Sequence, residues 1–205
     1  MNFINFVDYA GTFAFAISGI RLASAKRFDW FGAYVVGLVT AIGGGTARDL
    51  LLNVTPFWMQ QPSYIIITGV ALLSVIAFGK HLIRLNNTFF IFDAIGLGLF
   101  VVVGIEKSIE AGFPFWVSII MGMITGSVGG IIRDILINEV PLIFRKDIYA
   151  LACVLGGVVF YVCTQIHLQT EITQILAAVS VILMRIIAVR FHLSLPVLKG
   201  HDDFK

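Results

Sequence analysis

The chain has 205 residues, of which 59% are hydrophobic and 13% are charged, and its formal net charge is +2. Soluble domains use about 45–50% apolar residues. The composition therefore excludes an ordinary soluble protein and indicates an integral membrane protein, while the small net charge says little about partners.

Seven apolar stretches follow one another along the chain, each about as long as the 17–25 residues that a helix needs to cross a bilayer. The connections between them are short, so we expect an all-α integral membrane protein of seven transmembrane helices. It would form a single membrane domain over residues 1–205, with a short cytoplasmic tail at 191–205. The stretches lie at 4–21, 31–53, 63–79, 89–106, 115–138, 148–166 and 171–190.

Lysine and arginine residues are distributed unevenly over the two ends of these stretches. Lys107 lies alone on one side, and ten basic residues lie on the other. Because cytoplasmic loops carry an excess of Lys and Arg, we expect a multi-pass protein of the cell inner membrane with its N-terminus outside and its C-terminus in the cytoplasm. The ten residues are Arg21, Lys26, Arg27, Lys80, Arg84, Arg145, Lys146, Arg190, Lys199 and Lys205.

The chain repeats itself with an offset of 85 residues. The segment "GLVTAIGGGTARDLLLNVTP" at 37–56 aligns without a gap with "GMITGSVGGIIRDILINEVP" at 122–141. Each copy contains three expected helices, an odd number, so the second must cross the membrane upside down relative to the first. We therefore predict an inverted repeat of two three-helix units, 4–79 and 89–166, followed by a seventh helix at 171–190. Identical pairs include Asp8/Asp93, Gly11/Gly96, Phe15/Phe100, Gly19/Gly104, Thr40/Thr125, Gly44/Gly129, Gly45/Gly130, Arg48/Arg133, Asp49/Asp134, Asn53/Asn138, Pro56/Pro141 and Tyr64/Tyr149.

The middle helix of each unit contains a run of glycines beside an Arg-Asp pair. Glycine costs a helix about 1 kcal/mol relative to alanine, so we expect both helices to be interrupted there and to line a pathway near the midplane. Neighbouring hydroxyls would satisfy the backbone groups that a break frees. The alternative is close helix packing, because Gly122, Gly126 and Gly130 form a stripe of small residues with a counterpart in the first unit. The residues expected at the breaks are Gly43, Gly44, Gly45, Thr46, Ser127, Gly129 and Gly130.

Arginine and aspartate residues inside the expected helices need protein or water around them, since each costs about 2.5–3.5 kcal/mol at the centre of a lipid-facing helix. Consecutive helical residues point about 100° apart, so we do not expect Arg48 to pair with Asp49. Instead each Arg is expected to pair with the Asp of the first helix of its unit, Asp8 or Asp93. This would leave the Asp that follows each Arg without a local partner. The charged residues expected at the pathway or its gate are Asp8, Arg48, Asp49, Asp93, Arg133 and Asp134.

Two three-helix units, each with a Gly-Gly-x-x-Arg-Asp motif in its middle helix, followed by a seventh helix, resemble the trimeric intracellular cation (TRIC) channel family in its bacterial branch. The same unit is also described as a glycine-transporter domain. The resemblance implies a homotrimer in the lipid bilayer, with a pore in each protomer lined by the first, second, fourth and fifth helices. That pore would pass monovalent cations, chiefly potassium. Two features depart from the family: the long basic tail of the animal members is absent, and Val128 replaces the first glycine of the second motif.

Other functions find less support in the sequence. His81, His167, His192 and His201 lie in loops or the tail, and the chain contains no metalloprotease or nucleophile motif, so we expect no enzyme. We also expect no cofactor, no nucleic-acid partner and no metal of fixed coordination, only transient potassium. A carrier of a small solute such as glycine remains an alternative, because inverted repeats also build secondary transporters.

Distinct roles are expected for the two charged residues of each motif. Arg48 and Arg133 would hold the helices in register and set a gate, because a fixed cation in a cation pathway raises the barrier. Asp49 and Asp134, if they have no local partner, would face water and attract cations.

Overall fold

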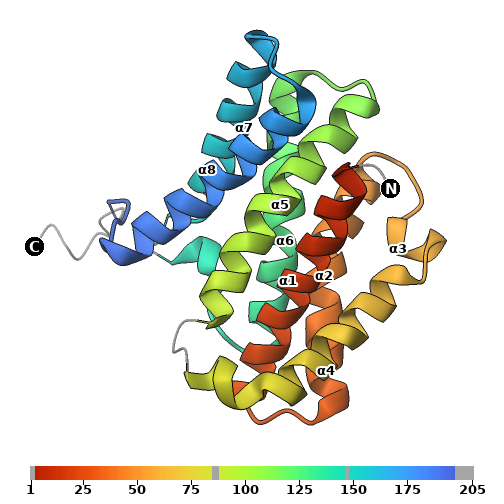
Figure 1. Cartoon of the computed structure of the whole chain (residues 1–205), viewed down its shortest axis with the longest axis vertical. Coiled ribbons are helices and arrows are strands. Elements are labelled where there is room, and N and C mark those ends of the chain that lie inside the picture. The colour runs from red at the N-terminus through yellow and green to blue at the C-terminus, as the bar shows by residue number, and fades with distance from the viewer. Residues whose placement is uncertain (1–2, 85–87, 146–147, 197–205) are drawn as a thin grey trace, which may run out of the picture.

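The computed structural model describes residues 3–84, 88–145 and 148–196, and it consists of helices joined by short turns (Figure 1). Two short helices interrupt the connections, the four-residue α3 and a single 3₁₀ turn, η1. The elements are α1 Phe3–Ala25, α2 Trp30–Leu51, α3 Phe57–Gln60, α4 Ser63–Arg84, α5 Thr88–Glu110, α6 Phe115–Leu136, η1 Leu142–Phe144, α7 Ala150–Gln165 and α8 Thr170–Arg190.

A helix is found at each of the seven predicted ranges, with ends that differ by a few residues. Five of these helices are long and apolar enough to cross a membrane, and α4 and α7 contain shorter apolar segments, Ser63–Gly79 and Ala150–Gln165. The protein is thus an all-helical membrane protein. The predicted tail at 191–205 lies outside the described residues from position 197 onward.

Four helices, α1, α2, α5 and α6, form the centre of the molecule. Helix α1 packs against α2 and α5, and α6 packs against the same two helices from the other side. Helix α4 lies against α1 and α2, whereas α7 and α8 lie against α5. In Figure 1 the chain runs downward in α1 and upward in α5, so these helices are antiparallel. We call the end that carries the N-terminus in this view the upper end, and the opposite end the lower end.

Helices α2 and α6 are continuous through their glycines, so the predicted interruptions at Gly43, Gly44, Gly45, Gly129 and Gly130 are wrong. The physical reason is close packing. A Cβ atom added at Gly44 would overlap the carbonyl oxygen of Thr125, and one added at Gly129 would overlap the carbonyl oxygen of Thr40. The glycines therefore let the two backbones touch, which is the alternative that the small-residue stripe indicated.

The hydroxyl groups beside the glycines do not cap broken backbone. Thr46 Oγ1 donates to the Ile42 carbonyl at 2.7 Å, and Ser127 Oγ donates to the Met123 carbonyl at 2.6 Å. Each bond reaches four residues back in the same helix, as buried Ser and Thr commonly do. These hydroxyls are therefore satisfied within unbroken helices.

Two phenylalanines fill the centre of the bundle. Phe15 and Phe100 are buried, with ring centroids 5.1 Å apart in an edge-to-face arrangement. Each ring packs against a glycine of the opposite helix, Phe15 on Gly96 and Phe100 on Gly11. The repeat-related pairs thus fit into one another at the middle of the molecule.

Candidate functional site

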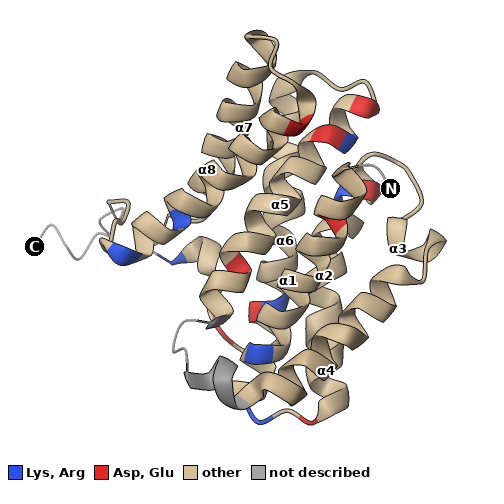
Figure 2. Ribbon diagram, in the orientation of Figure 1, with Lys and Arg blue, Asp and Glu red and all other residues tan. Residues whose placement is uncertain are grey.

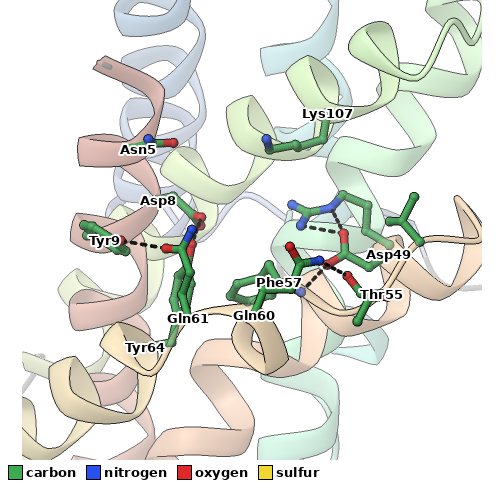
Figure 3. A pocket seen from close by; sticks show the side chains of 12 residues that line it. Asn5, Asp8, Tyr9, Asp49, Thr55, Phe57, Gln60, Gln61, Tyr64 and Lys107 are labelled. Atoms are coloured by element: carbon green, nitrogen blue, oxygen red, sulfur yellow. Dashed lines mark hydrogen bonds and ion pairs between the residues drawn. The ribbon is translucent and has the colours of Figure 1, made fainter. Parts of the chain in front are cut away.

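A pocket of about 220 Å³ opens at the upper end, between α1, α2, α5 and the turn that contains α3. Figure 3 shows Asp8 and Tyr64 on one side of it, Asp49 and Thr55 on the other, and Lys107 above. The Tyr64 hydroxyl donates to Asp8 Oδ2 at 2.7 Å. Among the described residues, no basic side chain lies within ion-pair distance of Asp8, so its carboxylate faces this upper pocket without a cationic partner.

Arg48 and Asp49 pair with each other at the upper pocket, so the expectation that they would not is wrong. Arg48 Nε donates to Asp49 Oδ1 at 2.8 Å, and Arg48 Nη2 lies 2.7 Å from the same oxygen. The 100° offset between consecutive residues does not prevent this, because the long Arg side chain reaches sideways with its Nε edge. The expected Asp8–Arg48 ion pair is therefore not formed.

Asp49 also stabilises the turn that follows α2. Its Oδ2 accepts a hydrogen bond from the backbone N–H of Phe57 at 2.8 Å. The chain reverses between them at Asn53, whose φ of 56° lies in the left-handed region that Asn tolerates better than most residues. Asp49 is thus buried and doubly bonded, contrary to the prediction that it has no local partner.

The same construction is found at the lower end. Arg133 Nε donates to Asp134 Oδ1 at 2.9 Å, and Asp134 Oδ2 accepts from the backbone N–H of Leu142 at 3.0 Å. Asn138 has a φ of 57°, which matches Asn53. The prediction that Asp134 lacks a local partner is therefore wrong too.

Arg133 also makes contacts that Arg48 does not. Its Nη1 lies 2.5 Å from Asp93 Oδ1 and 2.9 Å from Ser18 Oγ, and both charged side chains are completely buried. The predicted pairing of Asp93 with Arg133 is therefore confirmed. The Tyr149 hydroxyl, the counterpart of the Tyr64 hydroxyl, is buried and has no partner among the described residues.

The two ends therefore hold the repeated Asp residue in different ways. At the upper end the first-helix carboxylate accepts from a tyrosine, and at the lower end its counterpart binds an arginine. The lower end therefore binds its first-helix carboxylate through a buried ion pair, and the upper end does not.

A second pocket, of about 260 Å³, lies at the lower end beside Arg133 and Asp134. Lys26 and Glu139 form an ion pair of 2.6 Å at this lower pocket, and Arg145 lies 3.4 Å from the same carboxylate. The hydrogen bond from Lys26 lowers the pKa of Glu139 below its ordinary value. Figure 2 shows most charged residues gathered toward the two ends of the bundle.

Sequence reasoning missed several of the side chains that line these pockets. Tyr64, Lys107 and Glu139 all take part, as does Ser18, which binds Arg133. The sequence contains a signal that Tyr64 is important, because Tyr64 and Tyr149 occupy equivalent positions in the two repeats. The sequence contains no such signal for Ser18, since the equivalent residue of the second repeat, at position 103, is a valine.

Sequence comparisons find relatives along nearly the whole chain. A family model described as "Glycine transporter" matches residues 5–80 and again residues 90–165. The UPF0126 inner membrane protein YadS of Escherichia coli (strain K12) is 40% identical over 198 residues, which cover 94% of this chain and 95% of that protein. A UPF0126 membrane protein of Vibrio cholerae is 38% identical and covers 93% of this chain and 80% of the relative.

Solved structures with the same fold are described as channels. A TRIC trimeric intracellular cation channel orthologue from Rhodobacter sphaeroides has a TM-score of 0.87 at 33% identity and covers 94% of this chain and 100% of that chain. A second TRIC cation channel has a TM-score of 0.85 at 33% identity, with 98% and 99% covered. A trimeric intracellular cation channel from C. elegans, at 14% identity and a TM-score of 0.64, shares the fold alone.

Proposed function

Because this chain belongs to the glycine transporter family and shares its fold with TRIC cation channels, we propose that it is a potassium-permeable channel for monovalent cations. The observation that carries this proposal is the pair of pockets that enter the same four-helix bundle from opposite ends. A passage along α1, α2, α5 and α6 would join them. The buried Phe15 and Phe100 and the bonded Arg133 would block such a passage in the observed conformation.

The passage would lie between two inverted three-helix units, residues 4–79 and 89–166, with the seventh helix at 171–190 and the tail at 191–205 outside them. The antiparallel course of α1 and α5 supports this division. So do the repeat-related turns at opposite ends, where an Arg-bound Asp accepts from the backbone eight residues further on. We also propose that the protein is a homotrimer in the bilayer, with one passage in each protomer, as the description of its structural relatives as trimeric suggests.

Among the charged residues that line the upper pocket, Asp8 is the best candidate to attract cations. Asp49 is occupied by Arg48 and by the Phe57 backbone, whereas Asp8 binds only the neutral hydroxyl of Tyr64. A carboxylate in a narrow passage of low dielectric acts on ions more strongly than it does in bulk water. We therefore assign ion attraction to Asp8, and the holding of turns to Asp49 and Asp134.

Conduction is tested with purified protein in planar bilayers under a potassium chloride gradient. We expect unitary currents that reverse toward the potassium equilibrium potential. Asp8→Asn should reduce the preference for potassium over chloride, because it removes the free carboxylate of the upper pocket. Glu171→Gln is the matched control, since Glu171 is exposed on the first turn of α8 and should leave the permeability ratio unchanged. Equal ratios for Asp8→Asn and wild type would remove Asp8 from the pathway.

The second candidate is a carrier of a small zwitterion such as glycine. The specific observation is that the upper pocket has the Asp8 carboxylate together with two basic residues, Arg48 and Lys107. Such a pocket can bind an ammonium group and a carboxylate at once. Saturable uptake of glycine into liposomes, with no current in the bilayer experiment, would favour the carrier over the channel.

Membrane orientation is proposed from the excess of basic residues at the lower end. The upper end would face outward and the C-terminal tail would lie in the cytoplasm. Gln60→Cys and Lys199→Cys, each in a background with Cys153 and Cys163 replaced by alanine, can be labelled with an impermeant maleimide on intact spheroplasts. We expect labelling at position 60 and none at position 199 until the membrane is permeabilised. The reverse pattern would overturn the orientation.

A further inference from the structure

A third pocket, of about 170 Å³, lies between the C-terminal end of α5, the C-terminal end of α7 and the first turns of α8. Figure 1 shows the end of α5 and the α7–α8 turn together at the upper end of the molecule. Four oxygen-bearing side chains line it, Glu106, Thr164, Thr170 and Thr173, and its other residues are apolar. It shares no residue with the upper or the lower pocket, so it lies outside the proposed passage.

The oxygen atoms around this third pocket are incompletely bonded. Gln174 Nε2 donates to Glu106 Oε1 at 2.6 Å, which leaves Gln174 Oε1 buried without a partner. Thr173 Oγ1 is also buried without a partner, and Thr173 and Gln174 are only 2% and 5% exposed. Among the described residues, no Lys, Arg or His lies within ion-pair distance of Glu106. Buried polar atoms are normally paired, so these atoms point to a missing ligand.

The oxygens that are present are suited to accept rather than to donate. Thr164 Oγ1 uses its hydrogen on the Phe160 carbonyl at 2.9 Å, which leaves its lone pairs free. An ionised carboxylate offers only acceptors, and a hydroxyl oxygen carries two acceptor lone pairs as well as its one donor. A ligand for such a set must bring positive charge or hydrogen-bond donors.

We infer that the third pocket binds one small monovalent metal cation, coordinated by the Glu106 carboxylate together with the hydroxyl oxygens of Thr164 and Thr173, which line it. Carboxylate, hydroxyl and amide oxygens are the ligands that hard cations prefer. A single carboxylate balances one positive charge, whereas a divalent ion would remain half neutralised in an apolar setting. Within the described part of the chain there is also no group of three His, Cys, Asp or Glu residues of the kind that holds a multivalent metal.

The cation has a structural consequence for the bundle. Glu106 belongs to α5, Thr164 to α7 and Thr173 to α8, so the ion would tie the α7–α8 hairpin to one of the four central helices. Glu106 is followed directly by Lys107, which lines the upper pocket. An ion at Glu106 therefore also fixes the last turns of α5, from which Lys107 extends. The site exists whether or not the protein conducts.

Thermal unfolding of the purified protein in detergent tests this site. Midpoints are compared in sodium, potassium and N-methyl-D-glucamine chlorides at one ionic strength. We expect the wild-type midpoint to be several degrees higher in at least one alkali chloride than in the organic salt. Glu106→Gln should abolish this difference, and Thr173→Val should reduce it. Glu171→Gln, which makes the same charge change on an exposed residue of α8, should keep it.

Two results would overturn the inference. One is a wild-type midpoint that does not depend on the cation, and the other is a dependence that survives in Glu106→Gln, which would place the ion elsewhere. Should Glu106→Gln fail to fold, crystals of the wild type grown in rubidium chloride decide the question. An anomalous peak at coordination distance from Glu106 supports the site, and a map without such a peak rejects it.

Discussion

Arg133→Met should reduce the stability of the folded protein more than the removal of any other charge in the bundle. Arg133 is completely buried and binds two carboxylates, Asp93 and Asp134, as well as Ser18. Its loss leaves two buried acids without a cation, and breaking a buried ion pair by removing one partner costs about 3–5 kcal/mol. We expect a large fall in the yield of monodisperse protein and in the thermal unfolding midpoint.

Arg48→Met is the matched comparison, because Arg48 occupies the equivalent position of the first unit. It forms an ion pair with Asp49 alone, whereas Arg133 binds two carboxylates and Ser18. The removal of Arg48 should therefore cost clearly less. The double variant Arg133→Met with Asp93→Leu should recover part of the loss, since it removes one of the orphaned carboxylates. Equal losses for Arg48→Met and Arg133→Met would contradict the difference between the two ends.

The helices could be predicted from the sequence because each is encoded by an apolar pattern that extends over many residues. Apolar runs of about 20 residues average over many side chains, and the ends of the observed helices lie close to the predicted ranges. The Asp93–Arg133 pair was also predictable, since the repeat places both residues at one depth. The Asp8–Arg48 pair followed from the same reasoning and is not formed. Asp8 instead accepts a hydrogen bond from Tyr64, and Arg48 binds Asp49.

The course of the backbone at the glycines could not be decided from propensity alone. A glycine run weakens a helix, and it also allows a neighbouring helix to approach, and these two effects predict opposite structures. The second effect prevails because α2 and α6 pack against each other at these glycines. This packing belongs to the tertiary structure and cannot be derived from helix propensity. The third pocket had no sequence signal, since neither Glu106 nor Thr173 is among the residues that coincide in the repeat.

Gly44→Ala and Gly129→Ala should each disrupt the contact between α2 and α6. The added methyl group would overlap the carbonyl oxygen of Thr125 or of Thr40, and a backbone atom cannot turn aside as a side chain can. Overpacking of this kind typically costs about 1–3 kcal/mol, which exceeds the gain of about 1 kcal/mol that alanine brings to a helix. Because Thr40, Gly44, Thr125 and Gly129 are related by the repeat, the two variants should lose similar amounts. Thermal unfolding in detergent measures both losses.

Gly69→Ala provides the control. In the described part of the chain, no atom of another helix lies within 4 Å of a Cβ added at Gly69 in α4, so this variant should be neutral or slightly stabilised. Gly43→Ala should fall between the two, since the nearest atom to its added Cβ is the flexible Cδ1 of Ile132 at 3.2 Å. The expected order of unfolding midpoints is therefore Gly69→Ala highest, Gly43→Ala next and Gly44→Ala lowest. A Gly44→Ala protein as stable as Gly69→Ala would mean that α2 and α6 do not touch through their backbones. In that case the glycines would serve the passage and not the packing of the helices. If they serve packing, the loss of stability in each Gly→Ala variant should be larger where the added Cβ lies closer to an atom of the neighbouring helix.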